Sequence, residues 1–321
     1  MTALKGLRLS AWAAWCALAA ASSHAGAPLA EVTDFGSNPG RLRMFVHVPE
    51  NLPRDAALVV VHGCTQTAQD IADHSGWSDL AVAHGIALVY PQTSRENDSF
   101  AGCFRTWLPE HQQRDQGEPL SVMQMVRWML AHHALDPRKV FVTGLSSGGH
   151  LTNVMLATYP DVFQAGAPQS SFPYKCATSF EEVGPCCRGE RTHTREDWGA
   201  LARSGHPAYE GARPRVSIWH GEEDKLLVVS NLAYQRQQWT SALGIDDEPD
   251  STTTVDGYMG QRYEDATHSP RVETFSIPGL GHAVANDPDR TGARCGIAGP
   301  YASDVNVCAA LWIARWFGIA R

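Results

Sequence analysis

The sequence predicts an α/β fold, with a mostly parallel, twisted β-sheet and helices on both of its faces. Apolar runs of strand length alternate with segments of helical periodicity along most of the 321 residues. Runs such as ALVVV at 57–61 are apolar at every position, which is typical of strands covered on both faces. The segment 119–134 instead has apolar residues three and four positions apart, as on one face of a helix.

The elements follow in chain order. Strands are expected at 42–48, 57–61, 86–90, 140–143, 163–167, 216–219 and 272–277. Helices are expected at 68–83, 119–134, 147–158, 229–243 and 304–317. In the second helix, Leu120, Met123 and Val126 share one face, and Asp136-Pro137 ends it before the next strand.

Two segments interrupt this alternation. Residues 171–214 are rich in Gly, Pro, Cys and charge, and predict a Cys-rich loop or small cap. Residues 246–271 are polar and turn-rich, and predict an excursion before the last strand. Neither resembles an interdomain linker, and the sequence has no internal repeat. We therefore expect a single α/β domain over 26–321, with this Cys-rich loop or small cap at about 171–214.

Residues 1–25 have the features of a Sec-type signal peptide. Lys5 and Arg8 precede an apolar stretch, and the letters SHA at 23–25 fit the small-x-small cleavage pattern. No later stretch is long and apolar enough to span a membrane. The mature chain is therefore expected to be secreted, either to the periplasm or outside the cell.

The charge of the chain excludes two classes of partner. The formal net charge is −8 at pH 7, and no run of five or more Lys or Arg occurs. Nucleic acids and anionic membranes bind basic surfaces, so neither is an expected partner.

Seven cysteines remain after Cys16 leaves with the signal peptide. In an oxidising compartment most should pair, and the odd number leaves at least one free or paired between chains. The expected pairs are Cys64 with Cys103, Cys295 with Cys308, and Cys176 with either Cys186 or Cys187. Spacing alone does not fix this connectivity. The cysteines also lack the Cys-x-x-Cys spacing of a zinc site, so no metal is expected.

The stretch GLSSGG at 144–149 matches the G-x-S-x-G nucleophile elbow, a sharp turn between a strand and a helix. Such a turn crowds the positions two before and two after the nucleophile, so both favour glycine. Ser146 has Gly144 and Gly148 at these positions, whereas Ser147 would have a leucine at the first. Ser146 is the predicted nucleophile. An ordinary glycine turn is the alternative.

Backbone amides near this elbow are expected to form an oxyanion hole. Ser147 begins the next helix, so its N–H is available to a developing negative charge. The stretch HGCTQ follows the strand at 57–61, and in hydrolases with this elbow such a loop supplies the second amide. We expect Cys64 to donate it, and His62 to shape the loop without acting as the base.

An acid and a base follow two later strands. Asp224 comes four residues after His220 and is the predicted carboxylate, whereas Glu222 and Glu223 are expected to be solvated. His282 lies in GLGHAV, after the strand at 272–277, and is the predicted base. The chain order Ser, Asp, His is that of the α/β-hydrolase fold.

At this point the chain resembles the poly(3-hydroxybutyrate) depolymerase-type esterases, α/β-hydrolases related to secreted feruloyl and acetylxylan esterases. The matching stretches are LVVVHGCTQ (58–66), HGIALVYPQ (84–92), CFRTW (103–107), DPRKVFVTGLSSGGH (136–150), HGEED (220–224) and GLGHAV (279–284). The resemblance implies the same triad and oxyanion amides. It also implies that Trp107 lines the substrate cleft, although core packing explains this residue equally well.

The predicted function is thus a secreted serine esterase acting on hydroxyalkanoate esters, without a cofactor. Secreted depolymerases of this kind usually append a polymer-binding domain, whereas this sequence ends in an expected helix, which favours short esters or oligomers over polymer granules. A feruloyl or acetylxylan esterase acting on plant-wall esters is the alternative. A peptidase and a non-catalytic binding protein on the same scaffold also stay open. The oligomeric state has no signature in the sequence.

Overall fold

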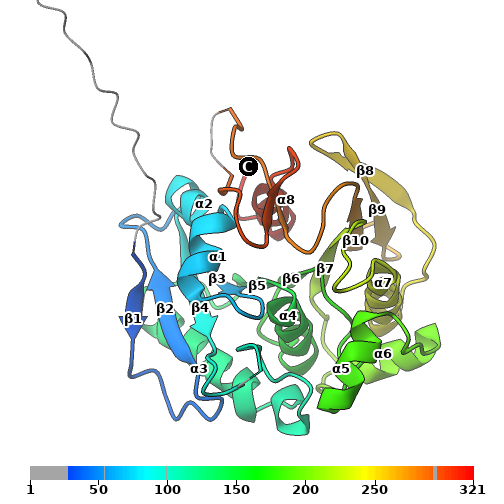
Figure 1. The fold of residues 1–321 in the computed structure, drawn as a ribbon, viewed down its shortest axis with the longest axis horizontal. Helices are drawn as coiled ribbons and strands as arrows, with labels where there is room; N and C mark the ends of the chain where they lie inside the picture. Colours follow the sequence, from blue (N-terminus) through cyan, green and yellow to red (C-terminus); the bar gives the residue numbers. More distant parts are fainter. Residues whose placement is uncertain (1–27, 54, 99, 292–294) are drawn as a thin grey trace, which may run out of the picture.

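A ten-stranded sheet forms the centre of the computed structural model, which describes residues 28–321 apart from 54, 99 and 292–294 (Figure 1). Its strand order is β1-β2-β4-β3-β5-β6-β7-β10-β9-β8. The strands are β1 (Ala30–Val32), β2 (Arg43–His47), β3 (Ala56–Val61), β4 (Ile86–Gln92), β5 (Val140–Leu145), β6 (Ala165–Gln169), β7 (Arg215–Gly221), β8 (Ser251–Val255), β9 (Tyr258–Glu264) and β10 (Pro270–Ile277). The central strands from β4 to β10 are parallel, and the outer ones pair antiparallel. The predicted mostly parallel sheet is confirmed.

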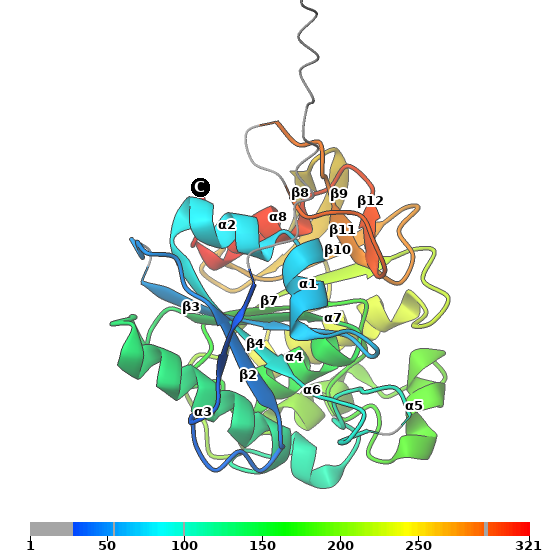
Figure 2. The ribbon, with the colours of Figure 1, turned by 60° about the vertical axis from the view of Figure 1, so that its left-hand side comes forward.

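Helices cover both faces of this sheet (Figure 2). One face carries α1 (Ala68–His74), α2 (Trp77–His84) and α8 (Ala309–Phe317), and the other α3 (Gly117–His132), α4 (Ser147–Thr158) and α7 (Ser230–Leu243). In β3, Leu58 and Val60 pack with the first group, while Val59 and Val61 pack with the second. Both faces of the strand are therefore buried, which explains its uniformly apolar sequence.

The helix expected at 68–83 is two helices. Thr67 caps α1, because its hydroxyl accepts the Asp70 N–H at 3.1 Å and its own N–H donates to the Asp70 carboxylate at 2.7 Å. Gly76 separates α1 from α2 with a φ of 80°, and a Cβ at this position would lie 2.8 Å from the nitrogen of Gly296. The break therefore depends on a tertiary contact that periodicity does not reveal.

The segment 246–271, expected as an excursion, contains the hairpin β8–β9, which extends the sheet. Asp256 and Gly257 form its turn with φ values of 45° and 89°, as the Asp-Gly pair favours. The mostly exposed strand STTTV has no apolar face, so its sequence does not predict a strand.

The segment 171–214 contains two helices that were not predicted. They are α5 (Phe180–Cys187) and α6 (Arg195–Arg203). Pro185 lies inside α5 and obscured its helical pattern. A disulfide joins Cys176 to Cys186, which leaves Cys187 as a free thiol.

The C-terminal helix is shorter than expected. Instead of covering 304–317, α8 begins at Ala309, because the chain before it pairs as β12 (Ala302–Asp304) with β11 (Val284–Asn286). A disulfide between Cys295 and Cys308 holds the start of the helix. The predicted signal peptide, 1–25, lies outside the described residues. Within the described part of the chain, no helix has the length and apolar character needed to cross a bilayer.

Candidate active site

The four loops singled out from the sequence follow the carboxyl ends of β3, β5, β7 and β10. These strands are parallel and close together in the sheet order, separated only by β6. The four loops therefore meet along one edge of the sheet, where sites of open parallel sheets lie.

Ser146 occupies a strained turn between β5 and α4. Its φ of 59° and ψ of −119° are unfavourable for a residue with a Cβ. A Cβ at Gly144 would lie 2.6 Å from the carbonyl of Gly148, and one at Gly148 would lie 2.3 Å from the carbonyl oxygen of Val61. The turn therefore requires glycine on both sides. It places Ser146 at its tip and Ser147 at the first position of the helix.

Asp224 and His282 form a hydrogen-bonded pair. The distance from His282 Nδ1 to Asp224 Oδ2 is 2.7 Å, and Asp224 Oδ1 accepts the N–H groups of Leu226 and Leu227, each at 2.9 Å. Burial alone would raise the pKa of Asp224, but the bond to His282 and the backbone donors outweigh it, so the pKa is lowered. The carboxylate stays ionised and fixes the proton of His282 on Nδ1, which leaves Nε2 free to accept.

His220 supports the loop that carries Asp224. It is fully buried at the end of β7, and its Nε2 donates to the carbonyl of Leu227 at 2.8 Å. The same nitrogen lies 3.5 Å from Asp224 Oδ2. Burial lowers the pKa of His220, so the ring is neutral and acts as a fixed dipole beside the acid. No sequence signal distinguishes His220 from an ordinary strand-end histidine, so this contact was not predicted.

The loop after β3 lies against the predicted nucleophile. A Cβ at Gly63 would lie 3.2 Å from the Cβ of Ser146, and the Gly63 N–H donates to the Gln66 side chain at 2.8 Å. A disulfide ties Cys64 in this loop to Cys103. The Cys64 amide, one of the two predicted oxyanion donors, is thus held in a loop that touches Ser146.

His62 is a structural residue of this loop. Its Nδ1 is 2.7 Å from the carbonyl oxygen of Gly63 and must donate, while Nε2 accepts the N–H of Thr93 at 3.2 Å. Complete burial lowers its pKa to about 4, so the ring is neutral at ordinary pH. Both ring nitrogens are engaged, and neither is available as a base.

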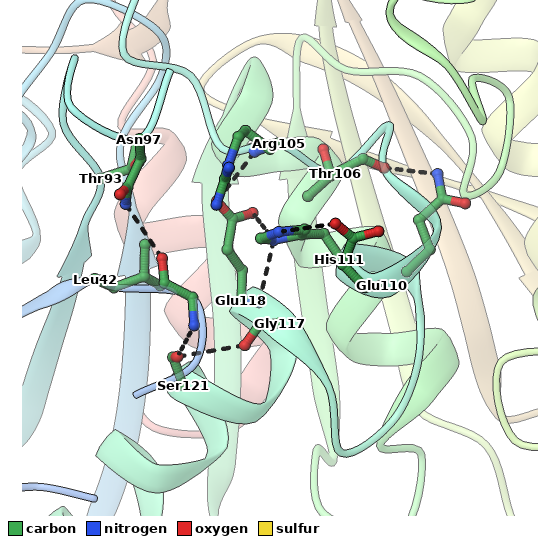
Figure 3. Close-up of polar contacts among 12 residues, drawn as sticks. Leu42, Thr93, Asn97, Arg105, Thr106, Glu110, His111, Gly117, Glu118 and Ser121 are labelled. Atoms are coloured by element: carbon green, nitrogen blue, oxygen red, sulfur yellow. Dashed lines mark hydrogen bonds and ion pairs between the residues drawn. The ribbon is translucent and has the colours of Figure 1, made fainter. Parts of the chain in front are cut away.

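Figure 3 shows the polar cluster that anchors the segment 103–107. Glu118 on α3 is fully buried, and its Oε1 accepts the backbone N–H of Arg105 at 3.1 Å. The side-chain amide of Gln112 donates to the carbonyl of Thr106 at 2.6 Å. These bonds fix the backbone between the disulfide cysteine and the tryptophan of the segment. The role of Glu118 was missed, because a Glu near the start of a helix usually indicates a capping charge.

A cavity of about 300 Å³ is lined by residues of all four loops. Ser146, His282, Cys64 and Trp107 all line it, together with mainly apolar side chains. Among the described residues no hydrogen bond joins Ser146 Oγ to His282. Catalytic hydrogen bonds often close only in the substrate complex, so two groups facing one cavity are compatible with proton transfer.

Three strongly exposed apolar side chains stand on the wall of this cavity. Phe100 is 74% exposed, Leu226 59% and Phe180 50%. The Phe180 ring meets Phe100 at 5.9 Å and Trp107 at 5.6 Å, both edge to face. The free Cys187 also lines the cavity, and burial raises its pKa to about 11, so it is a neutral thiol. The cavity therefore offers apolar and aromatic surface with few polar groups.

Comparisons with known proteins agree in the class of protein that they identify. A family model described as Esterase PHB depolymerase matches residues 43–252. Poly(3-hydroxyalkanoate) depolymerase C from Paucimonas lemoignei is 46% identical over 301 residues, which cover 94% of this chain and 72% of that protein. Feruloyl esterase B from Talaromyces stipitatus is 34% identical over 269 residues, covering 81% of this chain and 74% of that protein.

A solved structure agrees as well. Acetyl xylan esterase from Aspergillus awamori matches with a TM-score of 0.76 and 28% sequence identity, covering 92% of this chain and 100% of that one.

Proposed function

The chain belongs to the Esterase PHB depolymerase family and is a carboxylic-ester hydrolase, and on this premise we propose that Ser146, His282 and Asp224 are its catalytic triad. One observation carries the assignment of residues. The Asp224–His282 hydrogen bond ends at the same cavity that the strained Ser146 lines. These three groups lie on three separate loops, after β5, β7 and β10, and chemistry in that cavity is the purpose that they share.

In the first half-reaction, Ser146 Oγ forms a bond to the ester carbonyl carbon while His282 Nε2 takes the hydroxyl proton. Asp224 stabilises the imidazolium through the 2.7 Å bond to Nδ1. The tetrahedral intermediate then collapses. The alcohol leaves with the proton from Nε2, and the acyl group stays on Ser146.

In the second half-reaction, water attacks the acyl carbon and gives its proton to His282. The bond to Ser146 Oγ breaks, Oγ recovers the proton, and the carboxylic acid is released. The backbone amides of Cys64 and Ser147 stabilise the oxyanion in both steps, each contributing about 3 kcal/mol.

The apolar cavity supports esters with aliphatic acyl chains, such as hydroxyalkanoate oligomers, as the substrate class. Polar groups that could pair with sugar hydroxyls are few on its wall, and unpaired polar groups would penalise a carbohydrate. The aromatic edges of Trp107, Phe180 and Phe100 also suit a flat aromatic acyl group. A feruloyl ester is therefore the second candidate.

Export of the mature chain is part of the proposal. Three disulfides join six of its cysteines, and such bonds persist in oxidising compartments. The features of residues 1–25 supply a route for export.

A hydrolysis panel tests this function. The purified mature protein is offered hydroxybutyrate oligomers, feruloyl sugars and acetylated xylan, with Ser146→Ala as the blank. We expect the highest kcat/KM on the hydroxybutyrate oligomers. A preference for feruloyl sugars would favour the second candidate, and turnover by Ser146→Ala would overturn the triad.

A further inference from the structure

A second cavity, of about 270 Å³, lies far from the catalytic loops. Its main lining residues are Arg215, Arg262, Arg315, Glu273, Trp312 and Trp316. Arg215 is the first residue of β7, whereas the catalytic loops follow the carboxyl ends of the parallel strands. The cavity therefore lies between α8, which carries both tryptophans, and the sheet, toward the amino-terminal end of β7.

The wall of this cavity has an excess of positive charge. Glu273 is its one carboxylate, and it is buried against Arg262 at 3.3 Å and the Ser217 hydroxyl at 2.8 Å. Within the described part of the chain, Arg215 and Arg315 have no carboxylate within ion-pair distance. Three guanidinium groups against one carboxylate stand out on a chain whose formal net charge is −8.

The guanidinium groups are held in place by two indole rings. Arg315 lies 4.5 Å from the ring centre of Trp312, while Arg215 and Arg262 lie 5.0 and 5.9 Å from that of Trp316. Arg215 Nη2 also donates to the carbonyl of Trp316 at 2.8 Å. Stacking of this kind fixes long side chains before a ligand arrives, which lowers the entropy cost of binding.

The site also contains an unpaired donor. Trp316 is only 7% exposed, and its Nε1–H is buried without a hydrogen-bond partner. This nitrogen has no exposed surface, so Trp316 contributes to the cavity through its ring and not through this donor.

We propose that this cavity binds a small organic carboxylate. The planar guanidinium fork matches a carboxylate in shape and charge, and the indole rings suit the apolar body of such an acid. The volume equals that of about nine molecules of liquid water, which is enough for a small acid and too little for an oligomer. Ester hydrolysis releases acids of this class, but the binding site does not depend on the assignment of the triad.

Binding is measured by calorimetry on the purified mature protein at low ionic strength. The probes are sodium 3-hydroxybutyrate as the aliphatic acid, sodium 4-hydroxybenzoate as the aromatic acid, sodium sulfate, and neutral 4-hydroxybenzamide. The test variant is Arg315→Gln, because Arg315 is exposed and its loss should leave the fold intact. The matched control is Arg127→Gln, an exposed arginine on α3, which covers the other face of the sheet.

We expect saturable binding of at least one of the two acids, weakened about tenfold by Arg315→Gln and changed less than about twofold by Arg127→Gln. Which acid binds tighter identifies the class of the natural ligand. The proposal is overturned if no acid binds up to about 20 mM, if Arg315→Gln binds like the wild type, or if sulfate or the amide binds as well as the acids. Binding at the catalytic cavity would not respond to Arg315→Gln, so failure of the proposed triad leaves this test intact.

Discussion

At the scale of single residues, the proposed chemistry depends on how one carboxylate is held. Asp224 uses one oxygen for two backbone donors and the other for His282. Its carboxylate therefore cannot turn away from the imidazole, and the neutral ring of His220 packs beside it. The same acid thus sets both the orientation of His282 and the nitrogen that carries its proton.

Asp224→Asn should reveal this dependence. An asparagine amide can present an N–H to Nδ1 and so favour the wrong tautomer, which should lower kcat by about 10³- to 10⁴-fold with little change in Tm. The measurement is turnover of a soluble p-nitrophenyl ester. Glu223→Gln, which removes the exposed carboxylate next in the chain, is the matched control and should retain activity. Equal losses in the two variants would contradict the role of Asp224.

The two adjacent serines provide a second comparison. Ser146→Ala should abolish turnover, because it removes the attacking hydroxyl. Ser147→Ala should retain most of it, because the backbone N–H at the start of α4 remains. Steady-state rates on the same ester decide between them. The opposite result would move the nucleophile to Ser147.

Each site residue predicted from the sequence has a recognisable local sequence context. Ser146 lies between glycines, and Asp224 and His282 each follow an apolar strand at short distance. The supporting residues His220 and Glu118 lack such a signal, because their function arises from burial against partners that the fold brings to them. Tyr301 also lacks a sequence signal, although its ring packs against that of His282 with the ring centres 6.2 Å apart.

At the scale of elements, α5 contributes to the proposed catalytic cavity, although no periodicity in the sequence predicted this helix. The Cys176–Cys186 disulfide ties this short helix to the preceding loop. Its first residue, Phe180, lies between Phe100 and Trp107 at the cavity wall. The segment expected to be a cap therefore supplies apolar wall to this cavity.

Phe180→Ala should change substrate preference and leave the chemistry intact. Loss of this half-exposed ring should reduce kcat/KM about tenfold for a hexanoate ester, whereas an acetate ester, which is too short to reach it, should change little. Met259→Ala, which removes an exposed apolar side chain of β9, is the control. Equal losses on both esters would argue against a substrate contact.

Glu273 in β10 should make stability depend on pH. Burial raises its pKa to about 6 from an ordinary 4.5, against the opposing effects of Ser217 and Arg262. As the pH rises, the Glu273 carboxyl group therefore loses its proton at a lower pH in the unfolded chain than in the folded protein. The stability that the group contributes is fully present below about pH 4.5 and is lost as the pH passes 6.

Denaturant unfolding of wild type and Glu273→Gln at pH 4 and pH 7 measures this effect. The free energy of unfolding of the wild type, relative to that of the variant, should be about 2 kcal/mol higher at pH 4 than at pH 7. A difference that does not change with pH, or that changes with the opposite sign, would contradict the assignment.

The elements that were not predicted from the sequence were missed for two physical reasons. The β8–β9 hairpin lies at the sheet edge with mostly exposed residues on β8, and Gly76 breaks a helix by a contact with residues near 296. Strands buried on both faces were predicted within two residues, and β3 within one, because burial shapes their whole sequence. Edge strands and tertiary breaks leave little trace in composition.

At the scale of the whole molecule, the chain places two cavities of opposite character at different places on one sheet. The proposed catalytic cavity is apolar and nearly free of charge on its wall, whereas the cavity under α8 is cationic. Ester hydrolysis turns an uncharged bond into a carboxylate. The apolar cavity therefore suits the uncharged ester, and the cationic cavity suits the kind of acid that hydrolysis releases.

The most direct test of the account is the reaction of the mature protein with an organophosphonate probe, followed by mass analysis of its peptides. One phosphonyl group per chain should attach to Ser146, and the reaction should slow strongly in Asp224→Asn and vanish in Ser146→Ala. Labelling of Ser147, or the absence of labelling in a folded protein, would contradict the proposed triad.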